Sequence, residues 1–278
     1  MPEAPIALDH AKGRTWLKWH RGRKRAADME FDPDRIVEGM RCGASVEIDI
    51  VRHAGGGFAV LHDETLDRAT TGTGLVADAT HACLRGHTRR DNDGRATDTR
   101  IALLSDLCAS LSETVIGTGA LLQLDLKETS ATLTAADCLA FARAVRPVQR
   151  HVILSGGDAM AVAQLANALP DMQIGHDPCH FGTMDRLKAS GDDAEFVARA
   201  MEEAGRAGLI YLDIGLILDA LGREFDMIAA FHARGRRIDA YTIRAVTPET
   251  VRLCQQLVEL GVDQITTDDP EGLYSALR

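Results

Sequence analysis

The sequence has no excess of basic residues and no basic block. Its 31 lysines and arginines are outnumbered by 41 aspartates and glutamates, which leaves a formal charge of −10. A negative chain repels polyanions unless its basic residues cluster, and no long Lys/Arg run occurs. We therefore expect no nucleic-acid partner.

Long apolar runs are also missing. No stretch reaches the roughly 18 apolar residues that a membrane-spanning helix needs. Glu3, Asp9 and Lys12 interrupt the N-terminal segment before the apolar core of a signal peptide could form. We expect a soluble, cytoplasmic chain with no membrane span, and the sequence leaves its oligomeric state open.

The cysteines form no paired motif. The six of them show neither a C-x-x-C pair nor zinc-type Cys/His spacing. Cys108, Cys138 and Cys254 fall at apolar positions of expected helices, where a free thiol behaves as a small hydrophobe. We expect reduced, buried cysteines.

The chain does contain a regular alternation of short apolar runs with segments of helical period. The expected strands are Thr15–Trp19, Val46–Ile50, Leu121–Leu126, Val152–Leu154, Met172–Gly175, Leu209–Ile214, Ile238–Ile243 and Gln264–Thr266. The expected helices are Pro33–Cys42, Ala135–Val145, Ala159–Leu169, Asp193–Ala207, Asp226–Arg234 and Pro248–Leu260. Thr247 suits the N-cap of the last helix, with Pro248 at its first position and Gly261 at its end.

Eight such units in roughly 250 residues predict a closed (β/α)₈ TIM barrel, an α/β fold, because open sheets usually carry fewer strands in that length. Between the second and third strands, residues 52–104 are rich in Gly, Thr, Asp and Arg. We interpret this segment as a small insertion on a single domain of residues 1–278. Within it, Arg85–Arg100 is expected to be a surface loop with a lid as one use.

Polar residues interrupt the apolar strands, and barrel enzymes place their working side chains at the carboxyl ends of strands. Glu47 and Asp49 are two apart in a strand, so both face the barrel interior. Asp125 and Lys127 repeat this spacing on the next strand. Three interior carboxylates need a cation, and Mg²⁺ or Ca²⁺ meets that need better than Lys127 alone. A structural ring of salt bridges without a metal is the alternative.

Imidazoles and a guanidinium are expected at the same rim. His20 and Arg21 end the first strand, and His62 follows the apolar run at 58–61. An imidazole can exchange protons near pH 7, and an arginine with a lysine can bind phosphate. His176 follows the fifth strand and could face substrate hydroxyls or bond the local backbone instead.

A series of motifs runs in order along nearly the whole chain. It comprises His20-Arg21-Gly22, Glu47-x-Asp49, His62-Asp63-Glu64-Thr65-Leu66-Asp67-Arg68, Thr70-Thr71-Gly72-Thr73-Gly74, Asp125-x-Lys127 and Gly261-Val262-Asp263-Gln264-Ile265-Thr266-Thr267-Asp268. In content and spacing the series resembles the glycerophosphodiester phosphodiesterase family, with the block that begins at His62 as its most specific part.

The resemblance implies a metal-dependent phosphodiesterase of lipid metabolism that hydrolyses a small-molecule phosphodiester to a phosphomonoester and an alcohol. It implies general acid and base roles for His20 and His62. It also implies roles for two further groups of side chains. These are the metal ligands Glu47, Asp49 and Asp125, and the phosphate-binding residues Arg21 and Lys127.

Three positions depart from the family pattern. Asp125 replaces a glutamate, as in the related sphingomyelinase D branch. Glu30-Phe31-Asp32 stands for Glu-Asn-Thr, and Tyr241-Thr242-Ile243-Arg244 stands for Trp-Thr-x-Asn. With His176, Glu30 and Tyr241 are therefore candidate substrate-binding residues. The added Arg244 predicts a substrate with a more polar or anionic alcohol.

Three other functions stay open. Attack by a substrate hydroxyl would give a cyclic phosphate, as sphingomyelinase D does. A metal-dependent lyase or isomerase acting on a sugar phosphate could use the same ion. A binding protein could keep the carboxylates without activity, although it would have no need of two proton-transfer histidines.

Overall fold

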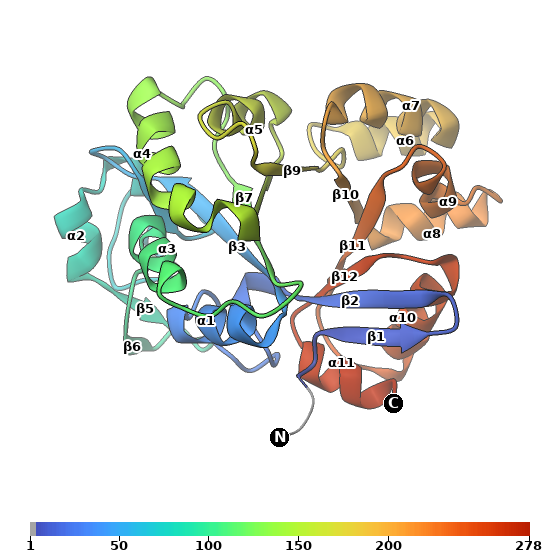
Figure 1. Cartoon of the computed structure of the whole chain (residues 1–278), viewed down its shortest axis with the longest axis horizontal. Helices are drawn as coiled ribbons and strands as arrows, with labels where there is room; N and C mark the ends of the chain where they lie inside the picture. The colour runs from blue at the N-terminus through green and yellow to red at the C-terminus, as the bar shows by residue number, and fades with distance from the viewer. Residues whose placement is uncertain (1–3) are drawn as a thin grey trace.

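Eight parallel strands close into a barrel in the computed structural model, which describes residues 4–278 (Figure 1). The hydrogen-bonded order is β2-β12-β11-β10-β9-β8-β7-β3, and pairing of β2 with β3 completes the ring. The strands are β2 (Gly13–Trp19), β3 (Ser45–Arg52), β7 (Leu121–Leu126), β8 (Val152–Gly156), β9 (Gln173–His176), β10 (Leu209–Asp213), β11 (Arg237–Ile243) and β12 (Gln264–Thr267). The predicted α/β TIM barrel is confirmed, and each expected strand overlaps one of these eight.

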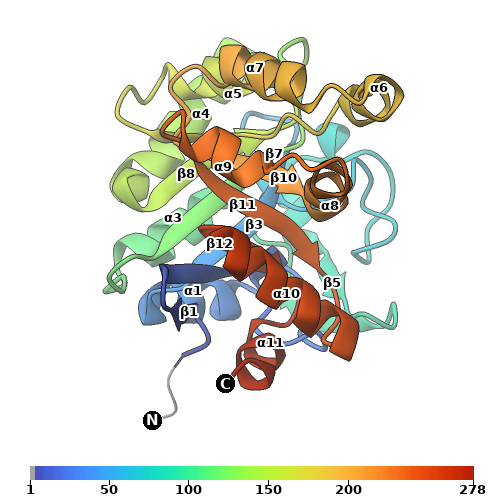
Figure 2. The ribbon, with the colours of Figure 1, turned by 90° about the vertical axis from the view of Figure 1, so that its right-hand side faces the viewer.

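Helices surround the barrel, as the end-on and side views show (Figures 1 and 2). They are α1 (Pro33–Cys42), α3 (Leu104–Ser112), α4 (Ala135–Val145), α5 (Ala159–Ala166), α6 (Thr183–Ser190), α7 (Asp193–Ala204), α8 (Ile214–Gly222), α9 (Met227–His232), α10 (Pro248–Leu260) and α11 (Pro270–Ala276). Helix α10 begins and ends as predicted. The Thr247 side chain accepts the Thr250 N–H, and Gly261 ends the helix with a φ of 86°.

The barrel strands have an apolar outer face, and most of them carry polar side chains on the inner face. Val46, Ile48 and Leu124 are fully buried in the layer between strands and helices. The residues between them therefore point inward. Deep in the interior, the Lys18 ammonium lies 2.7 Å from Asp239 Oδ2, and both side chains are almost completely buried. The polar groups of the barrel are thus concentrated along its axis.

Residues 52–104 build a small separate layer. Strand β4 (Phe58–Val60) pairs antiparallel with β3, and the short helix α2 (His81–Gly86) precedes a hairpin of β5 (Thr88–Arg90) and β6 (Ala96–Arg100). The segment 85–100 lies mostly at the surface as expected, but it forms the end of α2 and a hairpin and is not a loop. The hairpin is held because Arg89, only 1% exposed, reaches across to the backbone and carboxylate of Glu30.

Strand β1 (Ala7–His10) pairs antiparallel with β2 at the edge of the barrel. Glu3, one of the residues expected to interrupt a signal peptide, lies outside the described residues. Among residues 4–278 no helix is both long and apolar enough to cross a membrane. All six cysteines are free. Cys108 and Cys254 are buried as expected, whereas Cys83 on α2 is exposed.

Candidate functional site

Three carboxylates meet inside the barrel near the carboxyl ends of β3 and β7. Glu47 and Asp49 project from β3, and the strand register places Asp49 beside Asp125 of β7. One oxygen atom from each of the three side chains lies within 4.8 Å of the others. The structure therefore brings together the carboxylates that strand alternation groups on one face.

The Lys127 ammonium lies between two of these carboxylates. Its Nζ is 2.7 Å from Asp49 Oδ1 and 2.6 Å from Asp125 Oδ2. On the other side, Arg21 Nε is 3.3 Å from Asp49 Oδ2. That oxygen is buried and accepts no hydrogen bond. Two cations thus compensate the three carboxylates only in part.

Arg21 reaches the cluster because the backbone turns sharply after β2. His20–Gly22 form a short 3₁₀ turn in which Arg21 has a φ of 54°, a left-handed conformation that costs a non-glycine residue about 1–2 kcal/mol. In this turn the Arg21 N–H donates to Glu47 Oε2 at 2.8 Å, and its guanidinium donates to Glu30 Oε2 at 2.8 Å. Two buried carboxylates thereby hold the strained residue.

The carboxyl groups differ in acidity. Burial, together with repulsion from Asp125, raises the pKa of Glu47. Burial and the neighbouring Glu47 raise the pKa of Asp49 to about 7. Burial also opposes ionisation of Asp125, but the Lys127 ammonium and a hydrogen bond from Ser155 lower the pKa of Asp125. A further cation would favour the ionised forms of Glu47 and Asp49.

The donor set fits a hard divalent cation. All three ligand groups are carboxylates, the oxygen donors that Mg²⁺ and Ca²⁺ prefer. Asp49 Oδ2 offers a buried oxygen without a hydrogen-bond donor. Glu47, Asp49 and Asp125 could therefore hold such an ion, while Lys127 and Arg21 stay beside it.

His20 lies next to this cluster. Its Nε2 is 3.9 Å from Glu47 Oε2, and its Nδ1 is 2.5 Å from Asp268 Oδ1. Burial opposes ionisation of Asp268, but the hydrogen bond and charge of His20, with Arg23, lower the pKa of Asp268. An ionised Asp268 therefore orients the imidazole. Sequence reasoning quoted Asp268 within a motif but did not assign it this role.

His62 reaches the same rim through a chain of ion pairs. Its Nδ1 is 2.8 Å from Asp63 Oδ1, and Arg68 Nε is 2.5 Å from Asp63 Oδ2. Arg68 Nη2 is in turn 3.4 Å from Glu30 Oε1, and Glu30 binds Arg21. His62 is therefore fixed by charges that lead back to the carboxylate cluster, and its side chain remains 39% exposed.

The Glu30 carboxylate forms ion pairs with four arginines. Its side chain is buried, and its two oxygens lie within 3.5 Å of guanidinium nitrogens from Arg21, Arg23, Arg68 and Arg89. Its place in the site is therefore to hold Arg21, with no oxygen left for a substrate.

His176 faces away from the rim. The preceding residue, Gly175, faces the barrel interior, because a Cβ there would collide with the inward-pointing Tyr211 ring. Side chains alternate between the two faces of a strand, so His176 points to the helix layer. There its Nε2 is 3.8 Å from Glu203 of α7. We leave His176 out of the proposed site. Tyr241 does lie at the rim, where its hydroxyl donates to Asp177 Oδ1 at 3.1 Å.

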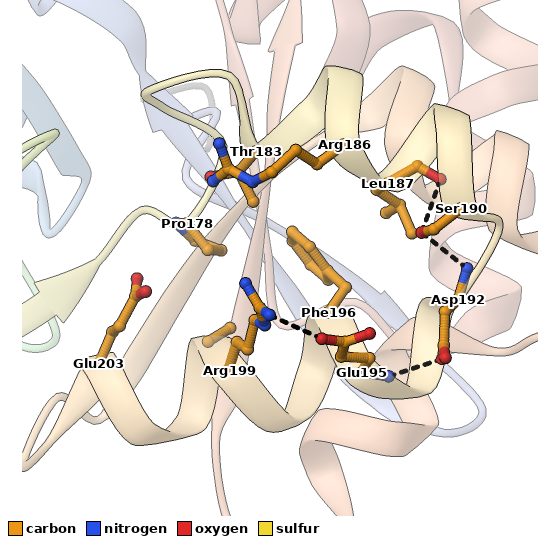
Figure 3. Close-up of a pocket in the computed structure, with 11 residues that line it drawn as sticks. Pro178, Thr183, Arg186, Leu187, Ser190, Asp192, Glu195, Phe196, Arg199 and Glu203 are labelled. Carbon is orange, nitrogen blue, oxygen red and sulfur yellow. Dashed lines mark hydrogen bonds and ion pairs between the residues drawn. The ribbon is translucent and has the colours of Figure 1, made fainter.

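A cavity of about 230 Å³ opens elsewhere, between α6 and α7 (Figure 3). Both arginines that line it are engaged with neighbouring groups. Arg199 pairs with Glu195, and Arg186 donates to the Phe181 carbonyl oxygen and to Thr183 Oγ1. None of the three clustered carboxylates lines it. The cavity is therefore separate from the site in the barrel.

Residues 39–272 match the model of the Glycerophosphoryl diester phosphodiesterase family. A Silicibacter pomeroyi DSS-3 protein assigned to these enzymes is 21% identical, with a TM-score of 0.73 over 99% of this chain and 96% of its own. The glycerophosphodiester phosphodiesterase of Thermotoga maritima is 21% identical, with a TM-score of 0.65 over 94% and 97%.

An Oleispira antarctica phosphodiesterase, solved in complex with the product sn-glycerol-3-phosphate, is 18% identical, with a TM-score of 0.66 over 94% of this chain and 96% of its own. At these identities the solved structures establish a shared fold. No curated protein matches the sequence.

Proposed function

Because the chain belongs to the glycerophosphoryl diester phosphodiesterase family, a family of hydrolases, we propose that its barrel site cleaves a small glycerophosphodiester or sugar phosphodiester in a metal-dependent reaction. The products would be a phosphomonoester and an alcohol. The observation that carries this proposal is the meeting of Glu47, Asp49 and Asp125 beside Lys127. The whole chain would act as one domain, with residues 52–104 as an insertion.

Glu47, Asp49 and Asp125 would hold Mg²⁺ or Ca²⁺. Such an ion, when bound, supplies Lewis-acid stabilisation of negative charge on a phosphate oxygen. Lys127 and Arg21 lie on either side of Asp49 and would neutralise the remaining phosphate charge. Arg21 is held in place because Glu30 binds its guanidinium and Glu47 binds its backbone N–H.

His20 and His62 would move the protons. Each presents Nδ1 to an aspartate, so each keeps Nε2 for exchange with a reacting oxygen. One imidazole takes the proton of the attacking water as the new P–O bond forms. The other gives a proton to the alcohol oxygen as the old P–O bond breaks. The bound product of the Oleispira antarctica enzyme supports a glycerol phosphate half in the substrate.

The test is a panel of glycerophosphodiesters, sugar phosphodiesters and lysophospholipids, assayed with and without a chelator. We expect turnover of at least one diester, its loss with chelator, and its recovery with Mg²⁺ or Ca²⁺. Phosphorus NMR of the products separates a phosphomonoester from a cyclic phosphate. Conversion of a sugar phosphate without cleavage of any diester would overturn the proposal in favour of a lyase or isomerase.

Two matched variants sharpen this test. Asp125→Asn removes one carboxylate of the cluster and should abolish metal-dependent activity. Asp213→Asn changes a carboxylate that ends β10 but accepts the Leu216 N–H at the start of α8, a bond that asparagine can also accept. Asp213→Asn should therefore keep the activity.

A further inference from the structure

A third histidine–aspartate pair lies at the barrel mouth, and the reaction above leaves it unused. Asp177 follows β9, and its Oδ2 is 3.1 Å from His180 Nε2. Asp177 Oδ1 accepts the Cys179 N–H at 2.8 Å and the Tyr241 hydroxyl at 3.1 Å. Asp177 is thus buried and bonded on both oxygens, whereas the His180 side chain is 45% exposed. The carboxylate holds the ring and leaves one face open.

The His180 ring sits beside the strand that supports the carboxylate cluster. A Cβ on Gly157, just after β8, would lie 3.0 Å from His180 Cγ, so the ring packs directly on the backbone there. On the same strand, Ser155 Oγ donates to Asp125 Oδ1 at 2.8 Å. His180 therefore occupies the β8–β9 side of the rim, beyond Asp125 as seen from β3.

The loop that carries His180 is braced from its outer side. Arg186 of α6 donates to the Phe181 carbonyl oxygen at 2.9 Å and to Thr183 Oγ1 at 2.8 Å. The Arg186 and Thr183 side chains lie together at the edge of the cavity between α6 and α7 (Figure 3). With Asp177 on one side and Arg186 on the other, the imidazole is presented in a fixed position.

The surroundings of His180 favour its protonated form. The hydrogen bond with Asp177 raises the pKa of His180, and the charges of Asp177 and Asp125 act in the same direction against burial and Lys127. An imidazolium here donates its Nε2–H to Asp177 and has its Nδ1–H left to donate. Arg244, which follows β11, is exposed at the barrel mouth and adds a second cation there, with no ion pair to its side chain among residues 4–278.

We propose that His180 binds an anionic oxygen on the alcohol portion of the substrate, so that the site prefers diesters with a negatively charged alcohol. The phosphodiester itself is already met by Arg21 and Lys127 around β2, β3 and β7. His180 lies two strands further round the barrel, where it contacts the alcohol portion of the substrate beyond the phosphate. Asp177 and Tyr241 are positioning residues. This inference rests on the proposed phosphodiesterase function.

The test compares His180→Asn with the unchanged enzyme on three diesters whose alcohols differ in charge. These are glycerophosphoinositol 4-phosphate, glycerophosphoinositol and glycerophosphocholine. Loss of a charge-assisted hydrogen bond should lower kcat/KM for the anionic diester about tenfold to a hundredfold, mainly through KM. The choline diester should change less than about threefold, because its alcohol offers no anion to bind. His180→Lys should restore part of the anionic preference.

A matched control is His232→Asn. His232 Nε2 is 2.8 Å from Asp263 Oδ2, a similar pair, but it lies at the amino ends of the strands. His232→Asn should leave kcat/KM for all three diesters unchanged. Tyr241→Phe should raise KM for the anionic diester less than His180→Asn does, with kcat retained. Equal losses on the anionic and choline diesters, or no loss at all, would overturn the inference.

Calorimetric titration separates this inference from the function itself. The same diesters are titrated into His20→Asn protein with and without His180→Asn, so that binding is measured while turnover is strongly slowed. Weaker binding of the anionic diester alone supports the role of His180. If the unchanged protein cleaved no diester, the proposed function would fail, and the titration would still decide whether His180 selects an anionic ligand.

Discussion

The replacement of Glu30 by glutamine tests how the site is held together. Glu30 is the shared counter-charge of four guanidinium groups, and its own side chain is 7% exposed. Arg89 is the most deeply buried of the four, and burial lowers its pKa to about 10 even with Glu30 beside it. Glu30→Gln keeps the shape of the side chain and removes only the charge.

The expected loss of stability follows from burial. Removing one partner of a buried ion pair costs about 3–5 kcal/mol, because the remaining charge is left uncompensated. The ion pair with the exposed Arg68 contributes less than about 1 kcal/mol of that. We therefore expect Glu30→Gln to lower the free energy of unfolding by about 3–5 kcal/mol at pH 7.

The pH dependence has a defined sign. Burial opposes ionisation of Glu30, but Arg21 and the other arginines lower its pKa below the ordinary value of 4.5. Its stabilising charge is therefore fully present above pH 4.5 and is lost as the pH falls through the lower folded-state pKa. The difference between the two proteins should shrink at acid pH.

Urea denaturation of both proteins, followed by circular dichroism at pH 7 and in acid, measures these effects. Glu38→Gln is the control. Glu38 also pairs with two cations, Lys24 and Arg35, but its side chain is 42% exposed, so the loss should stay below about 1 kcal/mol. If Glu30→Gln destabilised the protein no more than Glu38→Gln does, the buried-charge argument would be refuted.

Three further predictions concern the carboxylates and the histidines. A chelator should abolish activity and lower the melting temperature, and Mg²⁺ or Ca²⁺ should restore both; full activity of metal-free protein would exclude the ligand set Glu47, Asp49 and Asp125. Because burial and Glu47 raise the pKa of Asp49 to about 7, divalent-ion affinity measured by calorimetry should fall as the pH is lowered through 7, and Asp49→Asn should reduce this dependence to the part that Glu47 contributes. His20→Ala and His62→Ala should each lower kcat about a hundredfold or more on alkyl diesters. The variant that lacks the general acid should lose much less activity on an aryl diester, whose leaving phenolate needs little protonation. Equal losses on both substrates for both variants would contradict the division of roles.

The barrel was predictable because its signals are local. A period of two in the strands and of 3.6 in the helices is visible in short windows, and caps such as Thr247 mark where helices begin. The hairpin of β5 and β6, over Thr88–Arg100, was not predictable, because its polar sequence is ordered by the contact of Arg89 with Glu30, 59 residues earlier. No window of the sequence contains both partners.

The same distinction applies to the site. The grouping of Glu47 with Asp49, and of Asp125 with Lys127, follows from alternation within single strands. The orienting role of Asp268 depends on barrel closure, which brings it to His20 from 248 residues away. The outward direction of His176 depends on the register of β9, because a shift of one residue exchanges the inner and outer faces of a strand.

Closure of the barrel also sets when the site can form during synthesis. β2 lies between β3 and β12, so the first parallel strand made pairs with the last. Until β12 has left the ribosome, one edge of β2 stays unpaired on the nascent chain, and His20 has no Asp268 to orient it. A chain interrupted before β12 would therefore combine an open, aggregation-prone sheet edge with an inactive site. Closure of the sheet and orientation of His20 therefore depend on the same final strand.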